Sequence, residues 1–331
     1  MAKLCKKLID KLIGNEEGTL SSQEDLELGS RRFRNNSEFS AFDSIMKDHS
    51  DKESTKCVID ANHDQYYTQK ELRDNKEKYK NEVIHTMNEI TEYQLGEAIG
   101  RGCFGQVYRG FDLDTGCIMA IKQVEVLKFI KKNKQNIRLK ALEKEIRLLS
   151  TLSHPNIVKY LGKHNDGLFL NIFLEYVSGG SINVLLRKYG RFNETLVRIY
   201  TKHILQGLDY LHAHNVVHRD IKGANVLVDN NGVCKLADFG GSKRLIDSAE
   251  DIDTAVIGTA QWMAPEAIKN KGHGRHSDIW SVACTIIEMI QGRPPWSECE
   301  NSYAVLFKIA KSNAPPPYPE GLSSKLTDFL N

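Results

Sequence analysis

The sequence predicts an α+β fold of two lobes: a small antiparallel β-sheet lobe with one main helix, followed by a larger, mostly helical lobe. Between Tyr93 and Val177, short β-type runs alternate with turn residues, and a single helical stretch, Arg138–Leu152, lies among them. After Val177 the spacing of apolar residues becomes mostly helical. The expected strands are Tyr93–Ile99, Gln106–Phe111, Cys117–Val124, Ile157–His164 and Leu168–Glu175.

Residues 1 to about 90 differ in composition from the rest of the chain. After the first 14 residues they are polar and rich in Ser, Asn, Asp, Glu and Lys, which is typical of disorder with local helix. One such helix is expected from Thr68, because Thr68 and Glu71 fit a capping box. We therefore expect an N-terminal extension over 1–90 and a folded domain over 91–331, with lobes at 93–177 and 178–331.

The first 13 residues have a pattern of their own. Apolar pairs at positions 4/5, 8/9 and 12/13 recur every four residues between lysines, which predicts a basic amphipathic helix from Met1 to Ile13. Such a helix lies on a membrane, docks on a partner, or packs on its own protein. We favour a short helix that packs on its own protein or is frayed.

Composition excludes several classes of protein. The net charge of +2 in 331 residues gives no argument for nucleic acid as a partner. The seven cysteines form no C-x-x-C pair, so neither a disulfide framework nor a zinc site is indicated, and we expect a reducing, cytoplasmic compartment. The most apolar stretch, Ile279 to Ile290, is too short to span a bilayer and contains Glu288, so it predicts a buried helix and no transmembrane segment.

A glycine-rich segment, Gly100 to Val107, matches the pattern G-x-G-x-x-G-x-V. Glycines are needed where backbone amides approach phosphate oxygens without an intervening Cβ. The same spacing marks dinucleotide-binding folds of dehydrogenases, but there a helix follows, whereas a strand-like run follows here. The loop is therefore expected to join two strands and to bind nucleotide phosphates through Gly100, Arg101, Gly102, Cys103, Phe104, Gly105, Gln106 and Val107.

A lysine on the next predicted strand, Lys122, suits the α- and β-phosphates of a nucleotide if an acid holds it in place. Glu145 and Glu143 on the predicted helix are the two candidates. Lys122 on its own is also compatible with an ordinary surface lysine, so its interpretation depends on the motifs that follow.

Three further motifs come in order along the chain. His218-Arg219-Asp220 with Asn225 matches H-R-D-x-x-x-x-N, Asp238-Phe239-Gly240 follows 13 residues after Asn225, and Ala264-Pro265-Glu266 comes later. With the glycine loop and the lysine strand, five elements occur in one order at these spacings. The sequence thus resembles eukaryotic protein kinases from Tyr93 almost to its end.

The resemblance implies a site that uses ATP and Mg²⁺. Asp220 would accept the proton of the substrate hydroxyl, and Lys222 would neutralise charge on the γ-phosphate. Asn225 and Asp238 would bind Mg²⁺. Glu145 is preferred over Glu143 as the partner of Lys122, because in the family this acid stands ten residues before the proline that Pro155 represents here.

By the same resemblance, an adenine pocket is expected. Its walls would be Ile99, Val107, Ala120 and Leu227, its gatekeeper Leu174, and its hinge Glu175, Tyr176 and Val177, all of which also suit ordinary core packing. Lys222, together with Thr259 beside the catalytic loop, is typical of kinases that act on serine or threonine.

The resemblance is greatest to mitogen-activated protein kinase kinase kinases of the yeast Ste-eleven type. It is carried by stretches such as Lys222–Asn225, Lys235–Gly240 and Trp262–Glu266. Such a kinase phosphorylates a downstream mitogen-activated protein kinase kinase and can itself have an upstream activating kinase or regulator. We expect phosphorylation of Thr254 or Ser248, with Arg219 pairing the phosphate.

The C-terminal end departs from the family pattern. Family members continue past the position of Asn331, with an arginine that pairs with the carboxylate at Glu266. We therefore expect an incomplete, C-terminally truncated helical lobe in which Glu266 lacks that partner, at a cost in stability. A non-catalytic kinase-fold binding module is the rival to an active enzyme.

Overall fold

The structure is a computed structural model of the chain. It describes residues 2–13, 90–101, 105–125, 142–143, 145–244, 258–269, 272–312 and 314–331. The predictions for the polar extension and for the helix from Thr68 lie outside the described residues, as do Gly102, Cys103, Phe104, Thr254 and Ser248.

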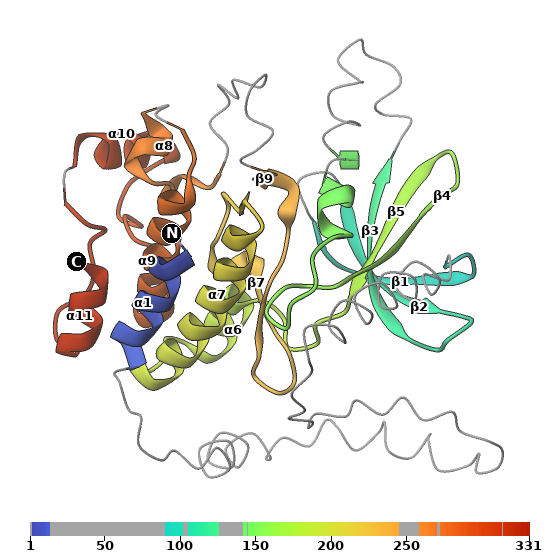
Figure 1. The fold of residues 1–331 in the computed structure, drawn as a ribbon, viewed down its shortest axis with the longest axis horizontal. Helices are drawn as coiled ribbons and strands as arrows, with labels where there is room; N and C mark the ends of the chain where they lie inside the picture. Colours follow the sequence, from blue (N-terminus) through green and yellow to red (C-terminus); the bar gives the residue numbers. More distant parts are fainter. Residues whose placement is uncertain are drawn as a thin grey trace, which may run out of the picture. The chain divides into compact units, whose positions relative to one another are not determined.

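The sheet lobe is a five-stranded antiparallel sheet in the order β1-β2-β3-β5-β4 (Figure 1). The runs predicted as strands supply all five, and Met119, Ile121 and Phe173 form a small apolar core against the sheet. The predicted helix of this lobe is present at residues 142–143 and 145–149, and it ends before Leu152. The strands are β1 (Tyr93–Arg101), β2 (Gln106–Asp112), β3 (Ile118–Glu125), β4 (Tyr160–Asn165) and β5 (Phe169–Glu175).

The start of the fourth strand was predicted wrongly. Strand β4 begins at Tyr160, not Ile157, because the preceding residues hydrogen-bond to the other lobe. The N–H of Val158 donates to the carbonyl of Leu236 at 3.0 Å, and the N–H of Leu236 donates to the carbonyl of Asn156 at 2.9 Å. The β-type pattern at Ile157 therefore reflects a parallel bridge to Leu236 that ties the two lobes together.

The second lobe is mostly helical, as predicted (Figure 1). Polar side chains cap its main helices: Asn193 accepts from the N–H of Leu196, and Ser181 accepts from that of Val184. Its helices are α6 (Ile182–Tyr189), α7 (Glu194–Ala213), α8 (Pro265–Ile268), α9 (Arg275–Gln291), α10 (Ser302–Lys311) and α11 (Ser324–Leu330). Its short strands are β6 (Val216–Val217), β7 (Val226–Val228), β8 (Cys234–Leu236) and β9 (Lys243–Arg244).

Helix α9 forms the centre of this lobe. The apolar run predicted to be a buried helix lies within it, and Val282, Ile286 and Met289 have no exposed surface. The helix ends where Gly292 takes a left-handed conformation with φ of 77°, which glycine adopts without strain. Within the part of the chain that the structure describes, no helix is long and apolar enough to cross a membrane.

The helix predicted at the N-terminus is present as α1 (Ala2–Ile13) and contacts α7 and α11 of the helical lobe. At the other end of the chain, Leu326, Phe329 and Leu330 of α11 are buried in the main core. Glu266 is only half-buried and accepts a hydrogen bond from Ser277 Oγ at 2.9 Å. Glu266 therefore has a hydrogen-bond donor in this fold, whereas the cost expected for the missing arginine stays a prediction.

Candidate active site

The sheet registers place the candidate nucleotide residues on one face. Ala120 and Lys122 are two residues apart on β3, so their side chains project from the same side. Directly opposite them stand Leu174 on β5 and Val107 on β2, respectively. One wall of a pocket is thus built by the pairing of three strands.

Lys122 is held by two carboxylates. Its Nζ lies 2.9 Å from Glu145 Oε1 and 3.3 Å from Asp238 Oδ1, and Lys122 is only 5 % exposed. Burial disfavours the ammonium, but Glu145 and Asp238 outweigh this cost and raise the pKa of Lys122. Lys122 is therefore a fixed positive charge between the two lobes and not a surface lysine.

The two candidate acids for Lys122 are clearly separated. Glu145 is buried and bonds Lys122, whereas Glu143 is exposed. Burial raises the pKa of Glu145 and outweighs the opposing effect of Lys122. Lys122 contacts Oε1, and the buried Oε2 has no hydrogen-bond partner in the described residues.

This separation gives a matched pair of variants. In Glu145→Gln the charge that positions Lys122 is removed, whereas Glu143→Gln makes the same substitution on the exposed face of the same helix. A hydrogen bond to a charged group contributes about 1.5–3 kcal/mol, so we expect Glu145→Gln to lower nucleotide-dependent turnover about 10- to 100-fold. Equal losses in the two variants, measured by steady-state kinetics, would contradict this assignment.

Asp220 lies at the centre of a hydrogen-bonded triangle. Lys222 Nζ donates to Asp220 Oδ2 and to Thr259 Oγ1, both at 2.7 Å, and the Thr259 hydroxyl donates to Asp220 Oδ1 at 2.9 Å. The expected contact of Thr259 with the catalytic loop is thus present. Burial opposes ionisation of Asp220, but Lys222 and Thr259 outweigh it and hold the pKa of this carboxyl below its usual range. Asp220 is therefore a carboxylate at neutral pH, able to accept a proton.

Asn225 and Asp238 are the two candidate metal ligands. The amide nitrogen of Asn225 donates to the carbonyl oxygen of Asp220 at 2.8 Å and to its Oδ2 at 2.9 Å. Because both bonds use the amide nitrogen, Asn225 Oδ1 stays available as an oxygen ligand. Asp238 has a left-handed backbone with φ of 59°, and the next residue, Phe239, is buried against His218. Burial of Phe239 fixes the peptide from which the Asp238 carboxylate reaches Lys122.

The backbone of the catalytic loop is anchored to Asp278 in the first turn of α9. Asp278 has no exposed surface, and its carboxylate accepts the N–H of His218 at 3.0 Å and that of Arg219 at 2.8 Å. His212 Nε2 lies 2.8 Å from the same carboxylate. Arg219 has a φ of 71°, an uncommon conformation that costs free energy unless its surroundings hold it. The hydrogen bond to Asp278 holds Arg219 in this conformation, and Arg219 is the residue next to Asp220 in the chain.

A second buried acid, Glu288 of α9, also hydrogen-bonds the backbone of the catalytic loop. Its Oε2 accepts the N–H of Gly223 at 2.9 Å and the indole N–H of Trp262 at 3.2 Å. A Cβ at Gly223 would come within 2.7 Å of Glu288 Oε1, so only glycine fits here without rearrangement. Glu288 therefore links the catalytic loop to the segment that follows Thr259.

The remaining residues of the expected adenine pocket have mixed environments. Ile99 is 43 % exposed at the end of β1, Leu227 on β7 is half-buried, and Val177 is buried.

In the glycine loop, a Cβ at Gly105 would collide with the carbonyl oxygen of Gln123, whereas one at Gly100 would meet nothing within 4 Å. Gly105 is thus required by packing on β3, and space remains open beside Gly100.

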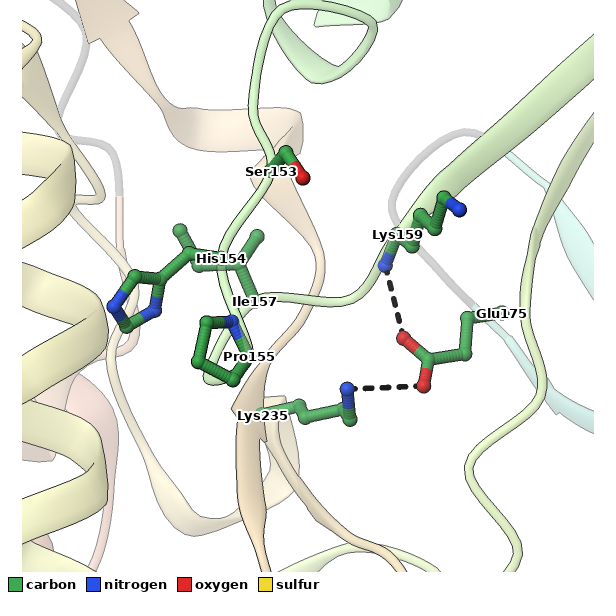
Figure 2. Close-up of a pocket in the computed structure, with 7 residues that line it drawn as sticks. All are labelled: Ser153, His154, Pro155, Ile157, Lys159, Glu175 and Lys235. Atoms are coloured by element: carbon green, nitrogen blue, oxygen red, sulfur yellow. Dashed lines mark hydrogen bonds and ion pairs between the residues drawn. The ribbon is translucent and has the colours of Figure 1, made fainter. Parts of the chain in front are cut away.

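Glu175, which is expected at the hinge, lines a separate cavity of about 280 Å³ (Figure 2). Its two carboxylate oxygens accept the N–H of Lys159 at 3.2 Å and pair with Lys235 Nζ at 3.0 Å. This cavity contains none of the catalytic or metal candidates, so it is not the candidate active site. The lining residues are Ser153, His154, Pro155, Ile157, Lys159, Glu175 and Lys235.

Because both carboxylate oxygens of Glu175 are engaged in this cavity, only its backbone can make the expected hydrogen bonds to adenine. Its N–H already donates to the carbonyl of Lys159 at 2.9 Å. The Lys235 ion pair also links the hinge to β8 of the helical lobe.

Comparison with known proteins agrees with this geometry. The family model described as protein kinase domain matches residues 93–331, most of the chain. The chain belongs to the protein kinase family. The matched region begins at the first residue of β1, so this kinase domain includes both lobes described above.

The kinase is similar to several mitogen-activated protein kinase kinase kinases. It is 50% identical over 240 residues to the Arabidopsis thaliana protein ANP1, and 47% identical over 244 residues to mitogen-activated protein kinase kinase kinase A of Dictyostelium discoideum. It is 43% identical over 244 residues to the serine/threonine-protein kinase BCK1/SLK1/SSP31 of Saccharomyces cerevisiae. These matches cover 72%, 74% and 72% of this chain, but only 36%, 26% and 16% of the relatives.

Proposed function

We propose that this chain is a serine/threonine protein kinase that transfers the γ-phosphoryl group of ATP to a protein hydroxyl. The observation that carries the proposal is the ionised Asp220, bonded at once to Lys222, Thr259 and Asn225. We infer further that it acts as a mitogen-activated protein kinase kinase kinase in a cytoplasmic cascade, with a mitogen-activated protein kinase kinase as substrate. The names of its relatives support this role.

Each side chain has one proposed task. Asp220 orients the substrate hydroxyl and takes its proton, while Lys222 neutralises charge that develops on the transferred group. Lys122, held by Glu145, positions the α- and β-phosphates. These roles are supported by the ionised state of Asp220 and by the fixed position of Lys122.

The donor set fits MgATP. Magnesium is usually held in nucleotide sites by one or two carboxylates plus substrate phosphates. Asn225 Oδ1 beside Asp220 and the Asp238 carboxylate beside Lys122 offer hard oxygens, and Lys122 provides the positive charge for phosphates. When bound, MgATP supplies the phosphoryl group and the cation that neutralises its charge. Phosphate-loop residues 100–107 and the adenine residues Ile99, Ala120, Leu174, Val177 and Leu227 complete the proposed site.

Specificity for serine and threonine can be tested with three peptides that differ only at the acceptor: serine, threonine or tyrosine. We expect MgATP-dependent phosphorylation of the serine and threonine peptides and none of the tyrosine peptide. Lys222 and Thr259, the two residues typical of serine/threonine kinases, are both bonded to Asp220, which supports this expectation. Preferential phosphorylation of the tyrosine peptide would contradict the proposed specificity.

A further inference from the structure

The N-terminal helix α1 buries one face in the helical lobe. Cys5 is 1 % exposed and belongs to the main core, while Leu8 and Ile9 pack half-buried against that core. Lys7 and Asp10 on the other side are exposed. Positions 5, 8 and 9 share one helical face, so α1 is held by the apolar stripe that its sequence predicts.

The two ends of α1 rest on different elements. Near its start, α1 packs on α7, and Cys5 is buried in the main core. Burial first, and then the charges of Asp209 and Asp278, raise the pKa of the Cys5 thiol to about 12. Further along α1, Lys11 Nζ pairs with Asp328 Oδ2 at 2.8 Å and donates to the carbonyl of Asp328 at 2.7 Å. Figure 1 shows α1 lying alongside α7 and α11.

The charges of the helix and of the surface beneath it are complementary. Helix α1 contains four lysines and one aspartate, and the surface presents Asp209 and Asp328. Asp209 Oδ1 is buried without a hydrogen-bond partner in the described residues. A carboxylate near the first turn of a helix is favoured by the partial positive charge of that helix end.

We propose that α7 and α11 form a docking surface for a basic amphipathic helix, that α1 of the same chain is its occupant, and that docked α1 supports the catalytic loop. The support runs through α7, on which α1 packs: His212 of α7 lies 2.8 Å from Asp278, the carboxylate that holds the N–H groups of His218 and Arg219. The docked helix buries the apolar face that a membrane would need, so the two states exclude one another. The docking stands on the fold alone, whereas the support of catalysis rests on the proposed kinase function.

The test compares two double variants of the full chain. Leu8→Asn with Ile9→Asn removes the buried stripe, and Lys7→Asn with Asp10→Asn places the same residue type on the exposed side without changing net charge. We expect the first variant to lower Tm by on the order of 5 °C and the second to leave it nearly unchanged.

Alkylation of Cys5 by N-ethylmaleimide, followed by peptide mass spectrometry, reports docking without any need for activity. A pKa of about 12 leaves roughly a thousandth of the thiolate that an ordinary thiol has at neutral pH. Cys5 should therefore react slowly in the wild type and the control, and at least about tenfold faster in the stripe variant. Equal rates and equal Tm values in all three proteins would overturn the docking.

Three further outcomes would also count against the proposal. Cys5 protection that rises with protein concentration would mean that a second copy supplies the helix. Loss of protection on adding phosphatidylserine vesicles to the wild type would favour a membrane as the partner. A kcat of the stripe variant equal to that of the control, below both melting temperatures, would overturn the support of catalysis; we expect a several-fold lower kcat.

Discussion

Replacing Asp220 with asparagine is expected to reduce phosphoryl transfer about 10²- to 10⁴-fold, the range observed when a general base is lost. The amide cannot take the proton of the substrate hydroxyl, and its NH₂ group faces the donors of Lys222 and Asn225. Lys122, Glu145 and Asp238 are untouched, so MgATP should still raise Tm as it does in the wild type. The measurement is turnover together with MgATP-dependent thermal stabilisation.

Asp114→Asn is the matched control for this variant, because Asp114 is an exposed aspartate in the turn before β3. We expect its turnover to equal that of the wild type. Retained turnover in Asp220→Asn would remove Asp220 from the chemistry. Loss of turnover with loss of the MgATP-dependent Tm shift would mean that the variant has lost binding.

Replacing Asp278 with asparagine is expected to destabilise the whole domain. The Asp278 carboxylate accepts hydrogen bonds from two backbone N–H groups and contacts His212, and none of this site is exposed to solvent. An amide nitrogen in place of one oxygen would face these donors, and each orphaned donor costs about 1–3 kcal/mol. We expect a loss on the order of 3–5 kcal/mol, measured by denaturant unfolding.

Activity of Asp278→Asn should fall even where the protein remains folded, because the strained Arg219 backbone would lose its restraint next to Asp220. The exposed Asp114→Asn again serves as control. An unfolding free energy and a kcat both unchanged in Asp278→Asn would show that α9 does not hold the catalytic loop.

Sequence motifs supplied the candidate residues of this site. The roles expected for Asp220, Asn225 and Asp238 came from the kinase resemblance. In the structure Asp220 and Asn225 share one hydrogen-bond network, and Asp238 contacts Lys122. The preference for Glu145 over Glu143 came from family resemblance, and the burial of Glu145 against Lys122 agrees with it.

The supporting residues were missed for a physical reason. Asp278 and Glu288 act through bonds to backbone N–H groups of a distant loop, and such bonds leave no periodic or motif signal. Glu288 did have a local signal, since it is a charged residue inside the most apolar stretch of the chain. It served only as an argument against a membrane helix, although a buried charge also indicates a structural or functional site.

The strands were predicted from local pattern, and the main error occurred where tertiary contacts decide. At Ile157 the β-type pattern is real, but its partner is Leu236 in the other lobe and not strand β5. The amphipathic pattern of α1 likewise predicted a helix, whereas only the fold places its apolar face on α7 and α11.

Transfer of the γ-phosphoryl group from MgATP to a serine/threonine protein substrate tests the central claim most directly. The account predicts transfer by the wild-type chain that EDTA abolishes and that Asp220→Asn lacks. A wild-type chain that melts cooperatively and is stabilised by MgATP, yet transfers no phosphate, would contradict the account and would identify a nucleotide-binding module instead.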